Sequence, residues 1–332
     1  MRAIALEEAA PLINNLLRRP CSLLPLTLLA AAACNSAPAS TPPQTATAGT
    51  TATTAPTTDP TTAKAPPAPD PETHAKLVAA LQNAARTPEE KARDKFRHPI
   101  ETLEFFGLKD TMNVVEISPG GGWYSVLLGP VLLEKGHWSA TTSDPNGPAD
   151  KESTKRAIKY RDRLGANPAL FGPHPDLRVV SMPDSFNLGP DGSADMVVTF
   201  RNIHNYLGEE GADGGANDSE FNILVTAIMK VLKPGGILGI EEHRAKKGAD
   251  WKEAAKTGYT PTEWLKGALT KAGFQFVAES EINANPSDTK DYDEGVWALP
   301  PSFARKGDKD HDKLAAIGES DRMTLTFRKP AK

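Results

Sequence analysis

The chain has 332 residues, of which 39% are hydrophobic, and a formal net charge of −4. This apolar content is enough for one sizeable hydrophobic core or two small ones. The slight acidic excess argues against a nucleic-acid-binding protein, which would usually carry a basic face, so we expect no nucleic-acid partner.

The first 34 residues differ from the rest of the chain. Arg18 and Arg19 precede an apolar run of 13 residues at 21–33. This run is shorter than the roughly 20 residues of a membrane-spanning helix, and a basic flank before it is typical of a secretory signal. Its small residues end at Cys34, so the segment resembles a bacterial lipoprotein signal, although Ala31 stands where such signals more often carry Leu. The alternative is an uncleaved N-terminal anchor.

This resemblance implies cleavage before Cys34, a lipid on that cysteine, and attachment to a membrane on the periplasmic side of the cell envelope. The only other cysteine is Cys21. The folded part would therefore contain no thiol, disulfide or cysteine-ligated metal. Residues 35–70 are almost wholly Ala, Thr, Pro and Ser, with too little apolar surface to offset the entropy lost on ordering, so they predict a disordered linker. The folded domain is expected over 71–332.

Helical periodicity opens the predicted domain. A first helix is expected over 73–85 and a second over 88–106. Thr87, Pro88 and Glu90 form a capping-box pattern at the start of the second helix, and Pro99 should break or kink it.

Strands and helices then alternate, which predicts a parallel sheet with helices on both faces. The last two strands are joined by a loop over 283–322 without a predicted helix, so we expect them to pair antiparallel. The predicted fold is α/β, with a Rossmann-like, doubly wound, seven-stranded sheet that is mostly parallel and has an antiparallel last strand. The predicted strands are 112–117, 137–142, 177–181, 194–200, 237–242, 274–282 and 323–327. The predicted helices between them are 123–133, 151–164, 220–232 and one that opens at a second capping box, Thr260–Glu263, and ends at Gly273.

A glycine-rich turn follows the first strand, in the segment VVEISPGGGWYS at 114–125. Ligands of open α/β sheets bind beyond the carboxyl ends of the strands, and glycines there let a ligand approach the backbone closely. The spacing Glu116-x-Ser118-x-Gly120-x-Gly122 does not fit the dinucleotide pattern G-x-G-x-x-G, which disfavours a nicotinamide-dependent oxidoreductase. No Gly-Lys-Ser/Thr follows, which excludes a P-loop. The alternative is a tight structural turn.

The turn is similar to motif I of class I S-adenosylmethionine-dependent methyltransferases, (E/D)-x-G-x-G-x-G, with Ser118 in place of the first glycine. The resemblance covers most of residues 100–328 and implies S-adenosylmethionine as cofactor. Short motifs that begin at Arg93, Arg97, Pro119 and Arg201 further resemble a subgroup of predicted methyltransferases, many with export signals. The cofactor-binding residues implied by the family pattern are Glu116, Ser118, Gly120, Gly121, Gly122, Asp144, Asp184 and Arg201.

Two of these acidic residues follow other strands. In the family, an acid in the position of Asp144 holds the ribose hydroxyls, and a polar residue in the position of Asp184 lies near the adenine. S-adenosylmethionine has a sulfonium, an ammonium and a carboxylate but no phosphate, so its site needs carboxylates and bare backbone rather than a lysine clamp. As alternatives, either acid could be a turn or capping residue.

The family fold also places the ends of the fourth and fifth strands next to the methyl group. His204 is the candidate base or acceptor-orienting residue, and His243 should converge on the same pocket. Asn202 is expected to hold cofactor or acceptor, and Arg201 to pair either with an acidic substrate or with Glu241. Each histidine could instead only bond a loop. The other histidines show no ligand-like spacing, so we assign no metal site.

Trp123 and Tyr124 open the predicted helix after the turn. They could contact the sulfonium through cation–π interactions or simply pack in the core.

These observations predict a monomeric S-adenosylmethionine-dependent methyltransferase that acts on a small-molecule or envelope acceptor. Because the cofactor is made in the cytoplasm, the alternative is a non-catalytic nucleoside- or ligand-binding module of the cell envelope that keeps the methyltransferase fold.

Overall fold

A computed structural model describes residues 68–208, 218–304 and 310–331. The predicted lipoprotein signal ending at Cys34 and the predicted linker up to residue 67 lie outside the described residues. Within the described ranges, no helix has both the length and the apolar character needed to cross a bilayer.

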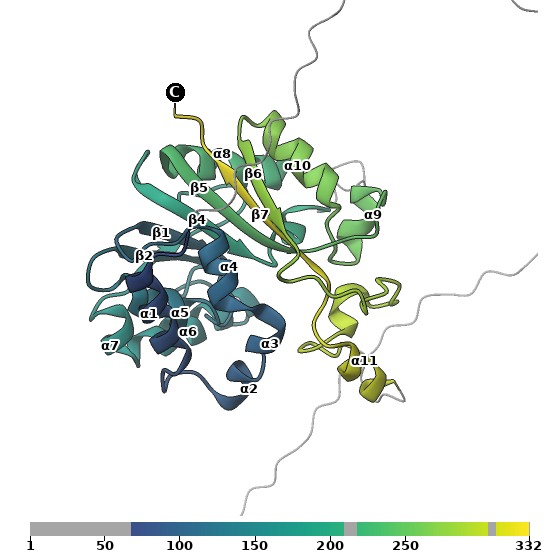
Figure 1. Ribbon diagram of the computed structural model, residues 1–332, viewed down its shortest axis with the longest axis horizontal. Coiled ribbons are helices and arrows are strands. Elements are labelled where there is room, and N and C mark those ends of the chain that lie inside the picture. The colour runs from purple at the N-terminus through teal and green to yellow at the C-terminus, as the bar shows by residue number, and fades with distance from the viewer. Residues whose placement is uncertain (1–67, 209–217, 305–309, 332) are drawn as a thin grey trace, which may run out of the picture. The chain divides into compact units, whose positions relative to one another are not determined.

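A seven-stranded sheet organises the described chain, with the strand order β3-β2-β1-β4-β5-β7-β6 (Figure 1). All neighbouring strands are parallel except that β7 runs antiparallel to both β5 and β6. The predicted doubly wound sheet with one antiparallel strand, the last in the sequence, is therefore confirmed. The strands are β1 (Asn113–Ile117), β2 (His137–Thr142), β3 (Asp176–Val179), β4 (Ala194–Phe200), β5 (Leu232–His243), β6 (Gln275–Ser280) and β7 (Arg322–Arg328).

Helices cover both faces of this sheet, and each face has its own hydrophobic core. Adjacent residues of β1 show the division, because Val114 packs into one core and Val115 into the other, as the period of two in a strand requires. One core includes Leu77, Leu103 and Leu127 of the helices drawn in blue in Figure 1, which are α1 (Pro71–Leu81), α4 (Pro99–Phe105) and α5 (Ser125–Leu132). The next helices in the chain, α6 (Glu152–Gly165) and α7 (Pro168–Phe171), add Leu164 and Phe171 to the same core.

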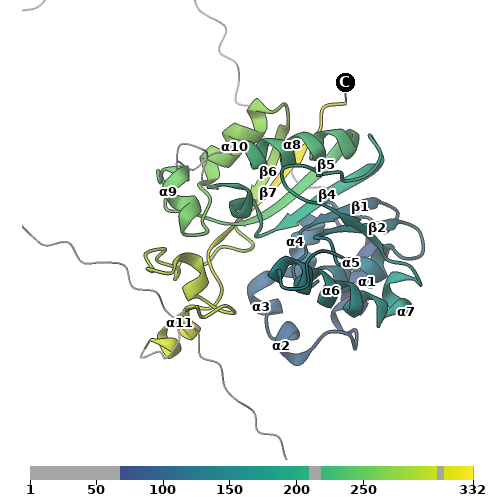
Figure 2. The ribbon, with the colours of Figure 1, turned by 180° about the vertical axis from the view of Figure 1, so that it is seen from behind.

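The opposite core lies beneath α8 (Ser219–Val231) and α10 (Thr262–Lys271), which contribute Leu224 and Leu265 (Figure 2). Two more helices, α9 (Trp251–Lys256) and α11 (His311–Ile317), follow β5 and precede β7. The sequence pattern did not predict α7, α9 or α11, each of which is seven residues or shorter.

The first predicted capping box is confirmed. Thr87 accepts a hydrogen bond of 3.2 Å from the Glu90 backbone N–H, and the Glu90 carboxylate accepts one of 3.1 Å from the Thr87 N–H. The predicted helix over 88–106 is divided into α2 (Pro88–Lys91), α3 (Asp94–Arg97) and α4. The break comes one residue before the proline, since His98 has a left-handed φ of +38° and Pro99 starts α4.

The second predicted capping box, at Thr260–Glu263, is wrong. Pro261 occupies the N-cap position of α10 and no side chain caps this helix. Thr260 instead pairs through its backbone with His243 and Ala245 beside the end of β5. This tertiary pairing shifts the helix start by one residue and leaves the predicted cap unused.

β1 pairs with β2 on one side and β4 on the other, so the connections run in opposite directions from its two edges. Such a switch point opens a crevice at the carboxyl ends of the strands. Ile117 lies opposite Thr199 in the sheet. The glycine turn after β1 and the segment after β4 therefore start side by side.

Candidate ligand site at the carboxyl ends of β1 and β4

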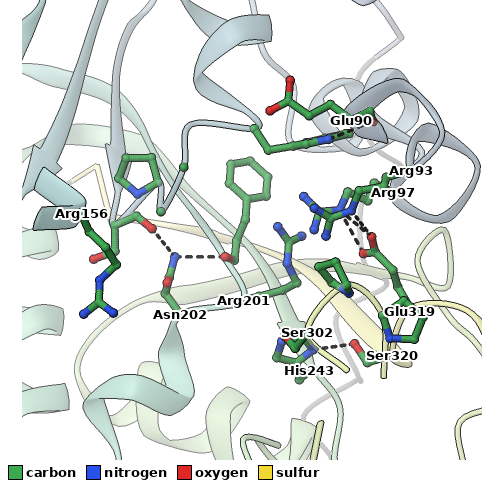
Figure 3. A pocket seen from close by; sticks show the side chains of 18 of the residues that line it. Glu90, Arg93, Arg97, Arg156, Arg201, Asn202, His243, Ser302, Glu319 and Ser320 are labelled. Carbon is green, nitrogen blue, oxygen red and sulfur yellow. Dashed lines mark hydrogen bonds and ion pairs between the residues drawn. The ribbon is translucent and has the colours of Figure 1, made fainter. Parts of the chain in front are cut away.

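A cavity of about 900 Å³ opens at this switch point (Figure 3). Its volume lies near the upper end of the range for small-molecule sites, roughly 300–1,000 Å³. The turn after β1 and the segment after β4 form part of its wall. The remainder comes from the α2–α3 region, from α6, from the end of β5 and from the chain before β7.

The backbone of the glycine turn is bare on the side of this cavity. Gly120 and Gly121 line the cavity, and a Cβ added to either would meet no atom within 4 Å. Gly122 has a different role, since its φ is +81° and a Cβ there would lie 2.8 Å from the Tyr160 ring. Two of the three glycines thus leave room for a ligand, and the third allows close packing against α6.

Ser118 and Asn202 tie the two strand ends together. Ser118 also has a positive φ, of +48°, and its N–H donates to Thr141 Oγ1 at 2.8 Å. The Asn202 side-chain amide donates to the carbonyl oxygens of Ser118, Phe200 and Ile117 at 2.9, 3.0 and 3.3 Å. Both residues line the cavity. The Asn202 amide nitrogen is therefore used to fix the geometry of the wall.

Glu116, predicted as a cofactor-binding residue, does not line the cavity. Its side chain is 1% exposed and accepts hydrogen bonds from Ser125 Oγ at 2.8 Å and Trp138 Nε1 at 3.2 Å. Burial raises the pKa of this carboxyl to about 7. The structure therefore places Glu116 beneath the turn, where it supports α5 and β2.

The other two predicted acids also lie outside the cavity lining. Asp144 is exposed after β2 and accepts a hydrogen bond of 2.8 Å from the Asn146 N–H. Asp184 is exposed in the connection between β3 and β4. Their predicted contacts with ribose and adenine stay predictions.

His204 and His243 converge on the cavity, with ring centroids 5.2 Å apart. They share Glu242, which is fully buried. Glu242 Oε1 lies 2.9 Å from His204 Nδ1 and accepts the His243 N–H at 2.8 Å, while Oε2 accepts the Ile203 N–H. His243 Nδ1 lies 2.6 Å from Ser320 Oγ. Burial and the neighbouring His204 hold the pKa of His243 well below its usual range.

Glu242 was not singled out from the sequence. The one available signal was its place at the end of the fifth predicted strand, next to His243. Donor atoms of His204, Glu242 and His243 lie within 4.8 Å of one another, a grouping that could hold a metal ion. The Glu242 oxygens are already engaged by three nitrogen atoms in this structure. We therefore describe these residues as two histidines that both bond to the Glu242 carboxylate, His204 through its ring and His243 through its backbone N–H.

Arg201 lines the cavity and pairs with Glu241, one of its two predicted partners. Its side chain donates to Glu241 Oε2 at 2.8 Å, and its backbone N–H donates to the Glu241 carbonyl at 2.7 Å. The other carboxylate oxygen of Glu241 accepts from Arg322 at 2.8 Å.

The two aromatic residues after the turn differ in role. Tyr124 stacks on Phe200 with centroids 3.5 Å apart and is fully enclosed in the core. Trp123 lines the cavity, but the cations against its ring are Arg97 at 4.6 Å and Arg86 at 5.1 Å. Core packing therefore explains Tyr124, and the Trp123 ring is already occupied by arginines of this chain.

Comparison with protein-family models and with curated proteins found no match. Among solved structures, the chain is similar to the [4+2]-cyclase SpnF, with 18% identity and a TM-score of 0.47 over 79% of this chain and 94% of that one. It is similar to a SAM-dependent methyltransferase from Aquifex aeolicus, with 19% identity and a TM-score of 0.41 over 63% and 93% of the two chains. It is also similar to geranyl diphosphate C-methyltransferase from Streptomyces coelicolor, with 13% identity and a TM-score of 0.47 over 76% of this chain and 87% of that one. The chain thus has structural neighbours among S-adenosylmethionine-dependent methyltransferases at low sequence identity.

Proposed function

We propose that this protein is an S-adenosylmethionine-dependent methyltransferase that acts on a small-molecule or envelope acceptor. The bare backbone at Gly120 and Gly121, facing the same cavity as His204, is the observation that carries the proposal. The missing side chains leave a cradle that a Cβ would fill, and this cradle suits a ligand that must approach the main chain closely. It lies at the switch point where open α/β sheets bind ligands.

The cofactor would supply an electrophilic methyl group. The chain would position the acceptor, exclude water from the cavity and accept a proton. Ser118 and Asn202 fix the cavity wall at the ends of β1 and β4 through their hydrogen bonds. The Glu242 carboxylate can only accept, so His204 donates from Nδ1 and keeps Nε2 free to accept a proton. His204 is therefore our candidate base for an acceptor that must lose a proton.

The adenosine part would extend from the glycine turn toward the ends of β2 and β3. This direction would bring the ribose to the exposed Asp144 and the adenine toward Asp184. The ligand would then reach beyond the cavity described above.

The location of the protein is a further part of the proposal, and it rests on the sequence before residue 35. We propose a monomer that belongs to the exported subgroup and is anchored to a membrane of the cell envelope through a lipid on Cys34. Mass spectrometry of the mature N-terminus tests this, because a lipid-modified peptide starting at Cys34 is expected. An unmodified, uncleaved N-terminus would contradict it.

Calorimetry tests cofactor binding, with S-adenosylmethionine and S-adenosylhomocysteine as ligands and a nicotinamide dinucleotide as control. We expect both sulfur nucleotides to bind and the dinucleotide not to bind. Transfer of a labelled methyl group to an envelope extract then tests catalysis. If neither sulfur nucleotide binds while other adenosine compounds do, the enzyme assignment falls and the protein is a non-catalytic binding module.

A further inference from the structure

Four arginines and two glutamates form a connected group at one side of the cavity, which we call the guanidinium cluster: Arg93, Arg97, Arg201, Arg322, Glu241 and Glu319. Glu319 accepts from Arg93 at 2.6 Å, from Arg97 at 3.0 Å and from Arg322 at 3.1 Å, and Glu241 accepts from Arg201 and Arg322. All except Arg322 and Glu241 line the cavity.

The positive charges of the guanidinium cluster exceed its negative charges by two. The cluster is also poorly hydrated. The side chains of Arg97 and Glu319 are each 4% exposed, that of Arg322 is 2% exposed and that of Glu241 is fully buried, while those of Arg93 and Arg201 are 23% and 16% exposed toward the cavity side. Uncompensated charge in such surroundings is costly unless a counter-charge is present. An anionic group in the cavity would provide it.

The nitrogens available for this anion belong to three arginines. Arg93 and Arg97 use Nε on Glu319, and Arg201 uses one terminal nitrogen on Glu241. Within the described ranges, no hydrogen bond engages the terminal nitrogens of Arg93 or Arg97. Figure 3 shows the three side chains converging from opposite walls of the cavity. Planar guanidinium groups with free terminal nitrogens match the geometry of carboxylate and phosphate oxygens.

The proposed cofactor does not neutralise this excess. S-adenosylmethionine carries a sulfonium and an ammonium against one carboxylate, so it adds a net positive charge. Two exposed cations on α6, Arg156 and Lys159, also line the cavity and would attract an anion toward it. This charge balance favours the second ligand, the methyl acceptor, as the source of the negative charge.

We infer that the methyl acceptor is an acid whose carboxylate or phosphate binds to Arg93, Arg97 and Arg201. This inference rests on the proposed function and names the substrate class of that site. Anchored by its anionic end, the acceptor would present its nucleophilic atom to the part of the same cavity that holds His204 and the glycine turn.

Titration calorimetry at constant ionic strength tests the inference with two probes, citrate for carboxylates and pyrophosphate for phosphates. Each is titrated into the wild-type protein with and without saturating S-adenosylhomocysteine. We expect at least one probe to bind in both conditions, with affinities that agree within about threefold. The tighter probe identifies the acidic group that the site prefers.

Two matched variants locate the binding. Arg93→Gln removes one charge from the guanidinium cluster and should weaken probe binding about tenfold or more, since hydrogen bonds to charged groups are the strong ones. Arg161→Gln makes the same change on the exposed face of α6, outside the cavity lining, and should weaken binding less than about threefold. The wild-type titration decides the inference even if a variant fails to fold.

Three results would overturn the inference: no binding of either probe, equal weakening by the two variants, or mutual exclusion between the probes and S-adenosylhomocysteine. The last result would assign the arginines to the carboxylate of the cofactor. If S-adenosylhomocysteine fails to bind while a probe binds, the proposed function falls but the anion site stands. If only S-adenosylhomocysteine binds, the anion site falls and the proposed function stands.

Discussion

Nδ1 of His204 lies 2.9 Å from Oε1 of Glu242, and this contact determines which imidazole nitrogen is available to a ligand. The carboxylate also accepts backbone N–H groups of Ile203 and His243, so it is held in place from three directions. A proton on Nδ1 leaves Nε2 as the proton acceptor. Glu242 is therefore a positioning residue for the candidate base.

Replacing this carboxylate tests the arrangement. In Glu242→Gln, an amide can donate to Nδ1 and favour the tautomer with a protonated Nε2. We expect turnover near neutral pH to fall at least about tenfold, approaching the loss in His204→Ala, because orientation and tautomer both matter for a base. The affinity for S-adenosylhomocysteine should stay within about threefold. An unchanged pH–rate profile in Glu242→Gln would contradict the assigned role.

The glycine turn offers a matched pair of substitutions. Gly121→Ala places a methyl group in open space, so the free energy of unfolding should change by less than about 1 kcal/mol while cofactor affinity falls. Gly122→Ala forces a side chain onto a φ of +81° and against Tyr160, so it should cost about 1–3 kcal/mol of stability. Denaturant unfolding and calorimetry separate the two effects. Full cofactor affinity in Gly121→Ala would show that no ligand lies over the turn.

The buried carboxyl of Glu116 predicts a pH-dependent stability. Its pKa is raised to about 7 in the folded state from 4.5, so the folded protein binds the proton more tightly than the unfolded chain. Between these two values, stability should fall as pH rises, by a total of about 3 kcal/mol from this group. Glu116→Gln keeps an acceptor for Ser125 and Trp138 without the titration.

The comparison of Glu116→Gln with wild type isolates this effect from that of His243. The lowered pKa of His243 acts in the opposite direction. Because this imidazole is buried in its neutral form, the folded protein loses stability as pH falls below the pKa that His243 has in the unfolded chain. We expect the stability difference between variant and wild type to grow in favour of the variant from pH 5 to pH 8. Parallel stability curves, measured by denaturant unfolding, would refute the raised pKa.

Asp144→Ala tests the proposed direction of the adenosine. If the ribose lies at the end of β2, loss of this carboxylate should weaken S-adenosylhomocysteine binding about tenfold. Asp150→Ala is the control, since it removes another exposed acid of the same loop. Equal dissociation constants for Asp144→Ala and wild type would leave Asp144 as a turn residue that bonds Asn146.

Local patterns predicted the sheet well because each strand has a signal within a few residues. The stretch Ala194–Phe200, with apolar residues at the successive positions 196–198, indicates a strand covered on both faces, and the structure has β4 over the same residues. The capping pattern at Thr87 likewise depends on a contact between residues three positions apart. Such signals can be read from the sequence because all the residues that form them lie within one short segment.

The site was predicted only in part, because its contacts join distant segments. The glycine turn and His204 were identified, and both line the cavity. The side of β1 to which Glu116 turns depends on packing against Ser125 and Trp138, which the motif does not encode. Glu319 lies in a segment predicted as a loop and meets arginines more than 220 positions earlier, so no local pattern could reveal it.

The bridge from Glu319 to Arg93 and Arg97 has a consequence for assembly. It connects residues 222 and 226 positions apart, near the two ends of the described domain. Contacts of such long range form late, because loop-closure entropy must be overcome first. A nascent or truncated chain could complete the central strands and still lack this wall of the pocket. Competence to bind an acid would then appear only after residue 319 has emerged from the ribosome and docked against α3.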